Sequence, residues 1–488
     1  MRFRIKSFKI GAGKPIVFVH KTDAKNLGIH VGNRVELSAD GKRIIAVVDL
    51  VGNYFEPGEI GVSEDIARRL ETKSGDSINL TFIPAPQSTR IIKKKLTCQP
   101  YAKRELNIII KDIVNNAITE AEIAYFISGV YHCGMSEEET INLTDAIYNN
   151  GQKISWSSNK IADKHSIGGI PGNRTTPIVV SICAEAGVIM PKTSSRAITS
   201  AAGTADVIET LTRVDLSIKE LKKVVKKTNA CLAWGGSLGL APADDKLIQI
   251  ERLINLDPEP QLIASILAKK LAAGSKYVLI DIPYGKNAKA TLSKAKRLKK
   301  KFLKIGGHFG LKIKVILTDG SQIIGNGIGP VLEMIDILKV LKREDSPKDL
   351  EDKSLKMAGV IMEMTGNAKK GQGIKKAKEI LESGKAFRKF KEIIEAQGGK
   401  IKTLKPGKFS QGITSLKSGK IKEIDGRSIA HTARLAGCPS DKSAGIYIQK
   451  HIGEKISKGE IIATIYSESN HKLREAIEFF NEFNPIKF

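Results

Sequence analysis

The sequence predicts a multidomain α/β protein: a small N-terminal β-barrel, a helical lobe, and a large α/β lobe with a β-rich C-terminal cap. Three observations predict this order. Short alternating apolar runs fill about the first 85 residues, helical periodicity replaces them from Tyr101, and short apolar strands then alternate with amphipathic helices. Beyond Pro406 the chain returns to short strands. Because 488 residues exceed what one hydrophobic core usually supports, about two to four domains are expected.

Residues 1–86 are expected to form the barrel domain. The segments 31–37 and 73–80 resemble one another, and a stretch that suits a helix precedes each, which suggests a duplicated half-barrel. Pro84 and Pro86 then mark a linker. The expected strands, separated by Gly, Asn and Asp turns, are 16–20, 34–37, 43–48 and 77–82.

Residues 87–158 are expected to form the helical lobe. Apolar residues recur there at three- and four-residue steps, as at Ile109, Ile113 and Ala117. Ser136 and Glu139 have the spacing of a capping box that opens a helix.

The α/β lobe is expected to comprise residues 159–241 and 274–405, followed by a β-rich subdomain at 406–488. Gly325 to Gly329 is glycine-rich, but its spacing is not GxGxxG and no acidic ribose contact follows about 20 residues on, so a dinucleotide site is rejected. The expected strands are 178–182, 277–282, 312–317, 444–451 and 460–466, with helices near 288–302 and 331–342.

Composition excludes some classes of protein. Apolar residues make up 41% of the chain and charged residues 27%, and no uninterrupted apolar run approaches the roughly 18 residues of a membrane span. The N-terminus alternates basic and apolar residues, unlike a signal peptide. We therefore expect a cytoplasmic protein with no membrane partner.

The net charge of +27 has two readings. A basic surface is typical of nucleic-acid-binding proteins, and a protein of that class remains an alternative. The lysines, however, are spread through helical segments such as 288–304 and 369–391, with few aromatic residues between them. We favour a solvated surface and no nucleic-acid partner, although the same charge would attract an anionic nucleotide.

The cysteines and histidines suggest neither a disulfide framework nor a metal site. The five cysteines are scattered and odd in number, with no CxxC pair, and the eight histidines are dispersed. We expect buried thiols and no metal. The cysteines are Cys98, Cys133, Cys183, Cys231 and Cys438.

Two stretches rich in Gly, Ser and Thr, at 164–173 and 191–209, are the most informative in the chain. Each lies beside an apolar run, at 178–182 or 188–190, that reads as a buried strand or helix. Two such loops at one sheet edge can direct several N–H groups and hydroxyls at one anion. The alternative is two ordinary flexible loops.

Together these loops resemble the phosphate site of the nucleoside phosphorylase family that contains the thymidine and pyrimidine-nucleoside phosphorylases. Within it, the chain is most similar to the archaeal-type AMP phosphorylases, which have an extra N-terminal domain. The resemblance is collinear from Leu96 to the C-terminus, and it continues at 235–246, 264–274 and 430–468.

The resemblance implies the fold and the phosphate site. It implies that residues of about 242–273 complete the helical lobe, that the protein is a homodimer or larger homo-oligomer, and that no metal or organic cofactor is required. For any single Ser or Thr, capping of a loop is the alternative role. The implied phosphate ligands are Lys164, Ser166, Thr176, Ser194 and Thr204.

The resemblance also implies contacts to the nucleotide. Ser265 and Lys269 are four residues apart in a helical pattern and share a face. Arg196 has an alternative role as a structural ion-pair partner, and we assign the 5′-phosphate to Lys289. The implied nucleotide-binding residues are Gly169, Ser195, Arg196, Ala197, Ile198, Thr199, Ser200, Thr204, Ser265, Lys269 and Lys289.

Asp257 is the candidate general acid. A base that leaves C1′ carries negative charge, so its protonation lowers the barrier. An aspartate stays partly protonated near neutral pH only through burial or a nearby anion. Taken without the family, the Asp257-Pro258 pair reads as a turn or helix start.

Two departures from the pyrimidine enzymes point to the substrate. Residues 197–200 replace a Gly-Leu-Gly-His-like run, and residues 248–251 replace a Leu-Arg-Asp segment, so the histidine and arginine of the pyrimidine pocket are missing. The resemblance therefore implies phosphorolysis of AMP, with CMP and UMP as further substrates. The alternatives are a pyrimidine-nucleoside phosphorylase and a phosphoribosyltransferase, although the chain has no paired-acid diphosphate motif.

Overall fold

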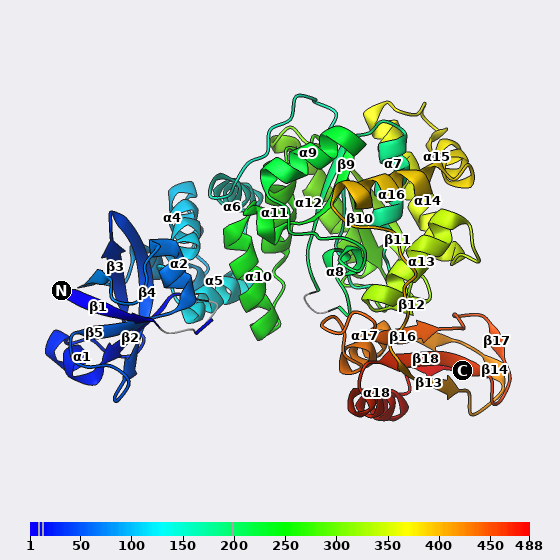
Figure 1. The fold of residues 1–488 in the computed structure, drawn as a ribbon. Coiled ribbons are helices and arrows are strands. Elements are labelled where there is room, and N and C mark those ends of the chain that lie inside the picture. Colours follow the sequence, from blue (N-terminus) through cyan, green and yellow to red (C-terminus); the bar gives the residue numbers. More distant parts are fainter. Residues whose placement is uncertain (8–9, 12–13, 198–199) are drawn as a thin grey trace. The chain divides into compact units, whose positions relative to one another are not determined.

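A computed structural model describes residues 1–7, 10–11, 14–197 and 200–488. The chain divides into two compact units. Figure 1 draws its ribbon in colours that follow the sequence. The first unit comprises residues 1–151 and 241–265, and the second comprises 152–240 and 266–488. Among the described residues, no helix is long and apolar enough to cross a membrane.

The first unit opens with a closed six-stranded barrel, drawn in blue in Figure 1, with strand order β1-β5-β2-β4-β3-β6. Alternate residues of the strands, such as Val17 and Val19 or Val35 and Leu37, are fully buried inside it. Helices α1 (Lys21–Leu27) and α2 (Glu64–Leu70) precede β3 and β6, which pair antiparallel. The strands are β1 (Arg2–Ser7), β2 (Ile16–His20), β3 (Arg34–Ala39), β4 (Lys42–Val51), β5 (Glu59–Val62) and β6 (Ser77–Phe82).

The barrel closes on its own first and last strands. β1 pairs antiparallel with β6, and the Met1 ammonium donates to the Leu80 carbonyl at 2.8 Å while the Leu80 amide donates to the Met1 carbonyl at 2.8 Å. A partly buried contact then joins the barrel to the helical lobe, since Arg34 forms an ion pair with Glu122 of α5.

Five helices make the helical lobe of the first unit. Ile109, Ile113 and Phe126 are fully buried, as their helical spacing predicts. The predicted capping box is confirmed, because the Glu139 amide donates to Ser136 Oγ at 3.1 Å and the Ser136 amide donates to Glu139 at 2.9 Å. The helices are α3 (Gln87–Leu96), α4 (Lys103–Val114), α5 (Glu120–Cys133), α6 (Glu137–Asn149) and α10 (Pro242–Ile254).

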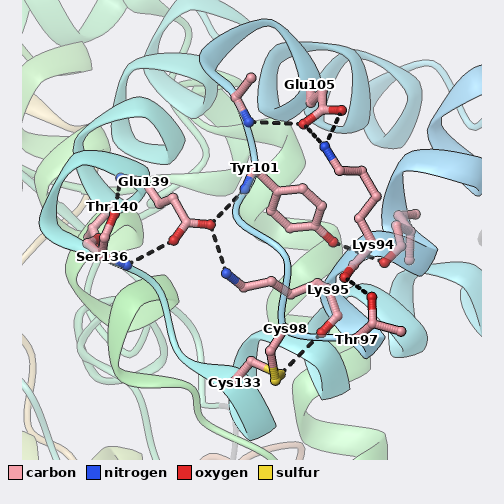
Figure 2. A network of polar contacts seen from close by, with 12 residues as sticks. Lys94, Lys95, Thr97, Cys98, Tyr101, Glu105, Cys133, Ser136, Glu139 and Thr140 are labelled. Carbon is pink, nitrogen blue, oxygen red and sulfur yellow. Dashed lines mark hydrogen bonds and ion pairs between the residues drawn. A yellow bond between two sulfur atoms is a disulfide. The ribbon is translucent and has the colours of Figure 1, made fainter.

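A buried ion pair ties three of these helices together, as Figure 2 shows. Lys95 of α3 donates to Glu139 of α6 at 2.7 Å, and the same carboxylate oxygen accepts from the Tyr101 amide, ahead of α4, at 2.8 Å. Burial alone would raise the pKa of Glu139, but the Lys95 ammonium and these amides hold it below its usual range. Because the buried charges of Lys95 and Glu139 are paired and hydrogen-bonded, they hold α3 and α6 in one packing arrangement.

Cys98 and Cys133 form a disulfide, so the expectation of five free thiols is wrong for this pair (Figure 2). The two residues are separated by 35 positions, but the ends of α3 and α5 bring their Cα atoms to 5.2 Å. His132 adjoins them, and the three residues are the one group of potential metal ligands close enough together among the described residues. The disulfide occupies both sulfurs. Cys183, Cys231 and Cys438 are buried free thiols, as expected.

A parallel sheet organises the second unit. Its strands run in the order β11-β10-β7 and β8-β9, and a parallel bridge between Ile161 and Ile189 joins β7 to β8. Leu279, Ile280 and Ile282 are buried in β10. The strands are β7 (Ala162–Ser166), β8 (Met190–Ser194), β9 (Ala230–Trp234), β10 (Tyr277–Tyr284) and β11 (Lys312–Asp319).

The strand expected at 178–182 is instead part of helix α7 (Thr176–Glu185). Every residue from Thr176 to Ala184 is buried, so the run has no polar face that would show a helical period. A short apolar run of this kind cannot be distinguished from a strand by periodicity. Pro177, near the helix start, is the local signal for a helix.

Most of the remaining helices belong to the second unit, and α11 begins in the first unit and ends in the second. The helix expected near 288–302 begins later, at Leu292, after the Thr291 cap. These helices are α8 (Thr204–Ile208), α9 (Ile218–Thr228), α11 (Glu259–Ala272), α12 (Leu292–His308), α13 (Pro330–Lys342), α14 (Lys348–Thr365), α15 (Gly373–Glu382) and α16 (Lys385–Ala396).

The C-terminal cap is β-rich, as predicted, and contains two helices that the sequence patterns did not predict, α17 (Gly426–Leu435) and α18 (Asn470–Phe483). The glycine-rich segment at 325–329 contributes β12 (Gly327–Ile328) to its main sheet, and Asp336 accepts from the Asn326 and Gly327 amides at 2.7 Å each. That sheet has the order β12-β16-β18-β13, with β13 (Phe409–Thr414), β16 (Gly445–Ile448) and β18 (Ile461–Ser467).

Candidate active site

The two Gly/Ser/Thr-rich loops begin at one edge of the parallel sheet. β7 ends at Ser166 and β8 ends at Ser194. Because the Ile161–Ile189 bridge is parallel, the carboxyl ends of both strands lie at the same edge. Crevices at this edge are the usual ligand sites of open α/β sheets.

Lys164 lies on β7 at the start of the first loop and is only 3% exposed. Its Nζ donates to Thr175 Oγ1 at 2.6 Å. Burial lowers the pKa of Lys164 to about 7; Asp281 opposes this effect and Lys192 adds to it. The buried ammonium therefore lacks a carboxylate partner of its own within hydrogen-bonding distance among the described contacts, and a bound anion would stabilise its charged form.

Asp163 precedes Lys164 and is held by two other buried lysines. Lys270 of α11 donates to its carboxylate at 2.7 Å, and Lys192 of β8 lies at 3.4 Å. Burial alone would raise the pKa of Asp163, but these two ammonium groups hold it below its usual range. The ion pairs connect β7, β8 and α11 beneath the loops.

Asp281, on the adjacent strand β10, holds the predicted phosphate ligand Ser166. Its carboxylate accepts from Ser166 Oγ at 3.0 Å and from Thr318 Oγ1 at 2.6 Å, and Lys353 of α14 lies at 3.2 Å. Ser166 Oγ therefore gives its proton to Asp281 in this structure, and the hydroxyl must turn away from that carboxylate to donate to a phosphate oxygen.

The charges beneath the loops do not balance. Four lysines, three of them buried and one with a side chain only 9% exposed, accompany two buried aspartates, which leaves two positive charges when every lysine is protonated. Burial and the nearby lysines hold the pKa of His165 well below its usual range, so the imidazole is neutral near pH 7. A dianion such as phosphate would complete the set. The lysines are Lys164, Lys192, Lys270 and Lys353, and the aspartates are Asp163 and Asp281.

The second loop is folded tightly on itself around Gly203. A Cβ atom on Gly203 would lie 2.5 Å from the Ser195 carbonyl, so a side chain does not fit there. Asp206 accepts from the Ala197 amide at 2.6 Å and from the Gly203 amide at 2.8 Å. These contacts fix the spacing between the start of the loop and Thr204, the first residue of α8.

Arg196 is held by protein carboxylates, which is the structural role left open from the sequence. It forms a bidentate pair with Glu209 at 2.7 and 2.8 Å and lies over the Trp234 ring, 4.8 Å from its centroid. The Glu209 carboxylate is the main cause that raises the pKa of Arg196. Ser195 and Ser200 are exposed on the same loop. Ile198 and Thr199 lie outside the described residues.

The structure brings two of the predicted nucleotide contacts together. Gly169 has a φ of +100°, and a Cβ atom there would lie 2.9 Å from the Lys289 amide nitrogen. The first loop therefore packs against the segment ahead of α12. Thr176, a predicted phosphate ligand, is buried at the first position of α7.

The other predicted residues are distributed over both units. Ser265 and Lys269 are half-buried on α11, and the division between the units falls directly after Ser265. Asp257 belongs to the first unit, is exposed, and lies two residues before α11. Asp257, the candidate general acid, is therefore not buried within its own unit.

Three families of known domains together match about half of the chain. The matches are the helical bundle domain of a glycosyl transferase family at residues 89–151, the a/b domain of a glycosyl transferase family at 158–287, and the pyrimidine nucleoside phosphorylase C-terminal domain at 420–487. The chain is also 42% identical to the AMP phosphorylase of Pyrococcus furiosus, over 100% of this chain and 98% of that protein.

Two further similarities bear on function and fold. A putative thymidine phosphorylase of Legionella pneumophila is 42% identical over 94% of this chain and 89% of that protein. Among solved structures, the anthranilate phosphoribosyltransferase of Thermus thermophilus has a TM-score of 0.54 at 13% identity, covering 63% of this chain and 99% of that chain. The latter likeness shows a shared fold.

Proposed function

The chain belongs to the AMP phosphorylase family, and we propose that it cleaves AMP with inorganic phosphate to give adenine and ribose 1,5-bisphosphate. The bond from C1′ to the base breaks, a bond from C1′ to a phosphate oxygen forms, and the departing adenine takes up a proton. The observation that supports this best is the excess of lysines beneath the two loops. Those lysines suit a dianionic nucleophile.

The phosphate is assigned to the loops at the carboxyl edge of the sheet. Lys164 supplies charge, while Ser and Thr hydroxyls orient the phosphate oxygens without neutralising them fully. The oriented dianion both stabilises the positive charge that develops on the ribose and forms the new bond. The assigned ligands are Lys164, Ser166, Thr176, Ser194 and Thr204.

The nucleotide is assigned to the flanking residues. We assign the 5′-phosphate to Lys289, which packs against Gly169, and the base to the face of α11 that Ser265 and Lys269 share. Because Arg196 is already paired with Glu209, its planar fork can offer the nucleotide only its remaining N–H groups. The rest of the set is Ser195, Ala197, Ile198, Thr199, Ser200 and Thr204.

The test is to incubate the protein with AMP and phosphate and to detect free adenine together with a bisphosphorylated pentose. A parallel reaction uses uridine, the substrate of the alternative pyrimidine-nucleoside phosphorylase. Faster consumption of uridine than of AMP would favour that alternative. Failure of both reactions, with product formed only from a pyrophosphate-activated ribose and Mg²⁺, would favour a phosphoribosyltransferase.

Asp257→Asn should lower turnover of AMP by about 100-fold and change AMP binding by less than about tenfold, because the amide keeps the shape but loses the transferable proton. Single-turnover rates and thermal melting measure the two effects. Asp425→Asn is the matched control, since Asp425 caps α17 by accepting from the Arg427 amide at 3.0 Å. If both variants melt normally and turn over AMP at the original rate, Asp257 has no catalytic role.

We further infer that the N-terminal barrel mediates assembly. All residues assigned to catalysis lie at or beyond Lys164, whereas the barrel exposes large apolar side chains at Val31, Tyr54 and Phe82. Deleting residues 1–86 should therefore lower the mass measured by light scattering. An unchanged mass would assign the barrel another role.

A further inference from the structure

Arg174 joins the two phosphate loops although no expectation from the sequence singled it out. It directly follows the first loop, two residues before α7, and its side chain is 15% exposed. Its guanidinium reaches the second loop, where Nη1 donates to Thr204 Oγ1 at 3.1 Å and Nη2 donates to the Ala202 carbonyl at 2.8 Å. One side chain thus contacts both the backbone and the hydroxyl of the loop assigned to phosphate.

A buried carboxylate anchors this guanidinium. Nε of Arg174 donates to Glu333 of α13 at 2.5 Å, and the Glu333 side chain is 1% exposed. The other Glu333 oxygen accepts from the Gly329 amide at 3.3 Å. Because Glu333 is fixed by its own helix and by this amide, the guanidinium has one defined position.

The bond to Arg174 determines which role the Thr204 hydroxyl has. A guanidinium has only donors, so Thr204 Oγ1 must accept from it. The hydroxyl then keeps its own proton, which it can donate to a phosphate oxygen. An anchored cation next to the hydroxyl also polarises it and strengthens that donation.

Thr175, the residue that follows Arg174, contacts the assigned phosphate ligand Lys164. Thr175 Oγ1 accepts from Lys164 Nζ at 2.6 Å, while Arg174 contacts Thr204. Two consecutive residues directly after the first loop therefore contact the two ligands: Thr175 contacts Lys164, and Arg174 contacts Thr204. The spacing between these two ligands depends on where Arg174 is anchored.

We propose that Arg174 is a positioning residue for phosphate: anchored on Glu333, it keeps Thr204 as a hydrogen-bond donor and fixes the distance between the two loops. This inference rests on the proposed function, because it takes inorganic phosphate as the ligand of these loops. A lysine cannot replace the arginine, since three acceptors on three different residues require the planar fork of a guanidinium.

The test compares phosphate use by variants of this pair. Arg174→Met alone leaves Glu333 buried without its partner and risks misfolding, so the main variant is Arg174→Met with Glu333→Gln. Its KM for phosphate should rise by at least about tenfold, whereas its KM for AMP should change by less than about threefold. Arg343→Met is the matched control, since Arg343 pairs at 2.5 Å with Glu351, whose side chain is 3% exposed, and contacts neither loop in any described interaction.

A double-mutant cycle shows whether Arg174 acts through Thr204. Thr204→Val removes the hydroxyl that accepts from Arg174. If the arginine works by orienting that hydroxyl, adding Arg174→Met and Glu333→Gln to Thr204→Val should raise the KM for phosphate by much less than it does in the parent. Equal effects in the two backgrounds would show that Arg174 does not act through Thr204 and would overturn the proposal.

Direct binding separates this proposal from the proposed function. Calorimetry with inorganic phosphate is run on the parent, the pair variant and Arg343→Met. A folded pair variant that binds phosphate as tightly as the parent overturns the role of Arg174, even if the parent cleaves AMP. Conversely, a parent that binds phosphate but does not cleave AMP contradicts the proposed function. The role of Arg174 is still supported in that case if the pair variant binds phosphate more weakly than both the parent and Arg343→Met.

Discussion

Replacing Lys164 with methionine should reduce phosphorolysis by about 10³-fold or more, because the nucleophile loses its buried positive charge. The same change should raise the melting temperature. Lys164 is only 3% exposed and hydrogen-bonds to Thr175 rather than to a carboxylate, so its charge destabilises the unliganded fold. Methionine keeps most of the volume without the charge. Loss of activity together with a gain in stability identifies a residue maintained for function.

The pH dependence of this stability gain follows from the pKa of Lys164, which burial lowers from 10.5 to about 7. Between these values the unfolded chain binds a proton that the folded chain does not, so the parent gains stability as pH rises through this window. The difference in melting temperature between Lys164→Met and the parent should therefore be largest below about pH 7 and shrink toward about pH 10. A difference independent of pH would contradict the buried-charge explanation.

Anion binding by the parent should weaken as pH rises, whereas the stability of the parent should increase. Sulfate remains a dianion across this range, so it reports on the protein rather than on its own titration. Its affinity for the parent should fall as pH rises above about 7, because Lys164 loses its proton. Lys164→Met should bind sulfate weakly at every pH. Calorimetric titration of both proteins with sulfate measures this.

Removing the Ser194 and Thr204 hydroxyls together should lower kcat/KM for phosphate by at least about 10²-fold and leave the fold intact. Within the second loop, Ser194 is the last residue of β8 and Thr204 is the first residue of α8. Arg174 donates to Thr204, and both hydroxyls are assigned to orient the nucleophile. The double variant Ser194→Ala with Thr204→Ala is measured by steady-state kinetics with phosphate varied.

The matched control removes two hydroxyls of the same kinds elsewhere in this unit. Ser181 and Thr228 donate to helix carbonyls at 2.7 and 3.0 Å and contact neither loop in any described interaction. Ser181→Ala with Thr228→Ala should keep kcat/KM within about threefold of the parent, since hydroxyls of this type contribute mainly to stability. Activity of the Ser194 and Thr204 variant at the level of this control would remove the second loop from the phosphate site.

Local chemistry explains why the sequence predicted the fold well. Alternation specified the barrel strands, and the spacing of Ser136 and Glu139 specified a helix start, because both depend on residues close in the chain. The prediction of secondary structure failed where complete burial left no alternation between polar and apolar residues. Residues 176–184 are buried on every side, so their helix was predicted as a strand.

The candidate site was predictable only in part, because its loops are continuous in sequence but the groups beneath them are not. Lys164 and Thr204 lie in recognisable loops, whereas Lys353 reaches Asp281 from α14 and Glu333 reaches Arg174 from α13. No spacing rule links such distant positions. Asp163, next to Lys164 on a short strand, and Lys192, in the second loop, are the buried charges that lie close to the recognisable stretches.

The disulfide illustrates the same limit. Cys98 and Cys133 are 35 residues apart, and the odd number of cysteines argued against pairing. Only the packing of α3 against α5 brings them together. Pairing of this kind depends on the tertiary structure, and the residues next to either cysteine in the sequence do not indicate it.

The closure of the barrel also bears on how such a chain can arise. Met1 and Leu80 are hydrogen-bonded to each other, so the segment enters and leaves the barrel at neighbouring points. A segment with adjacent ends can be joined to another gene, or lost from it, in one recombination event that breaks no strand pairing within it. The barrel is therefore suited to exchange between genes as a whole domain, and the same property suits it to insertion into an unrelated protein.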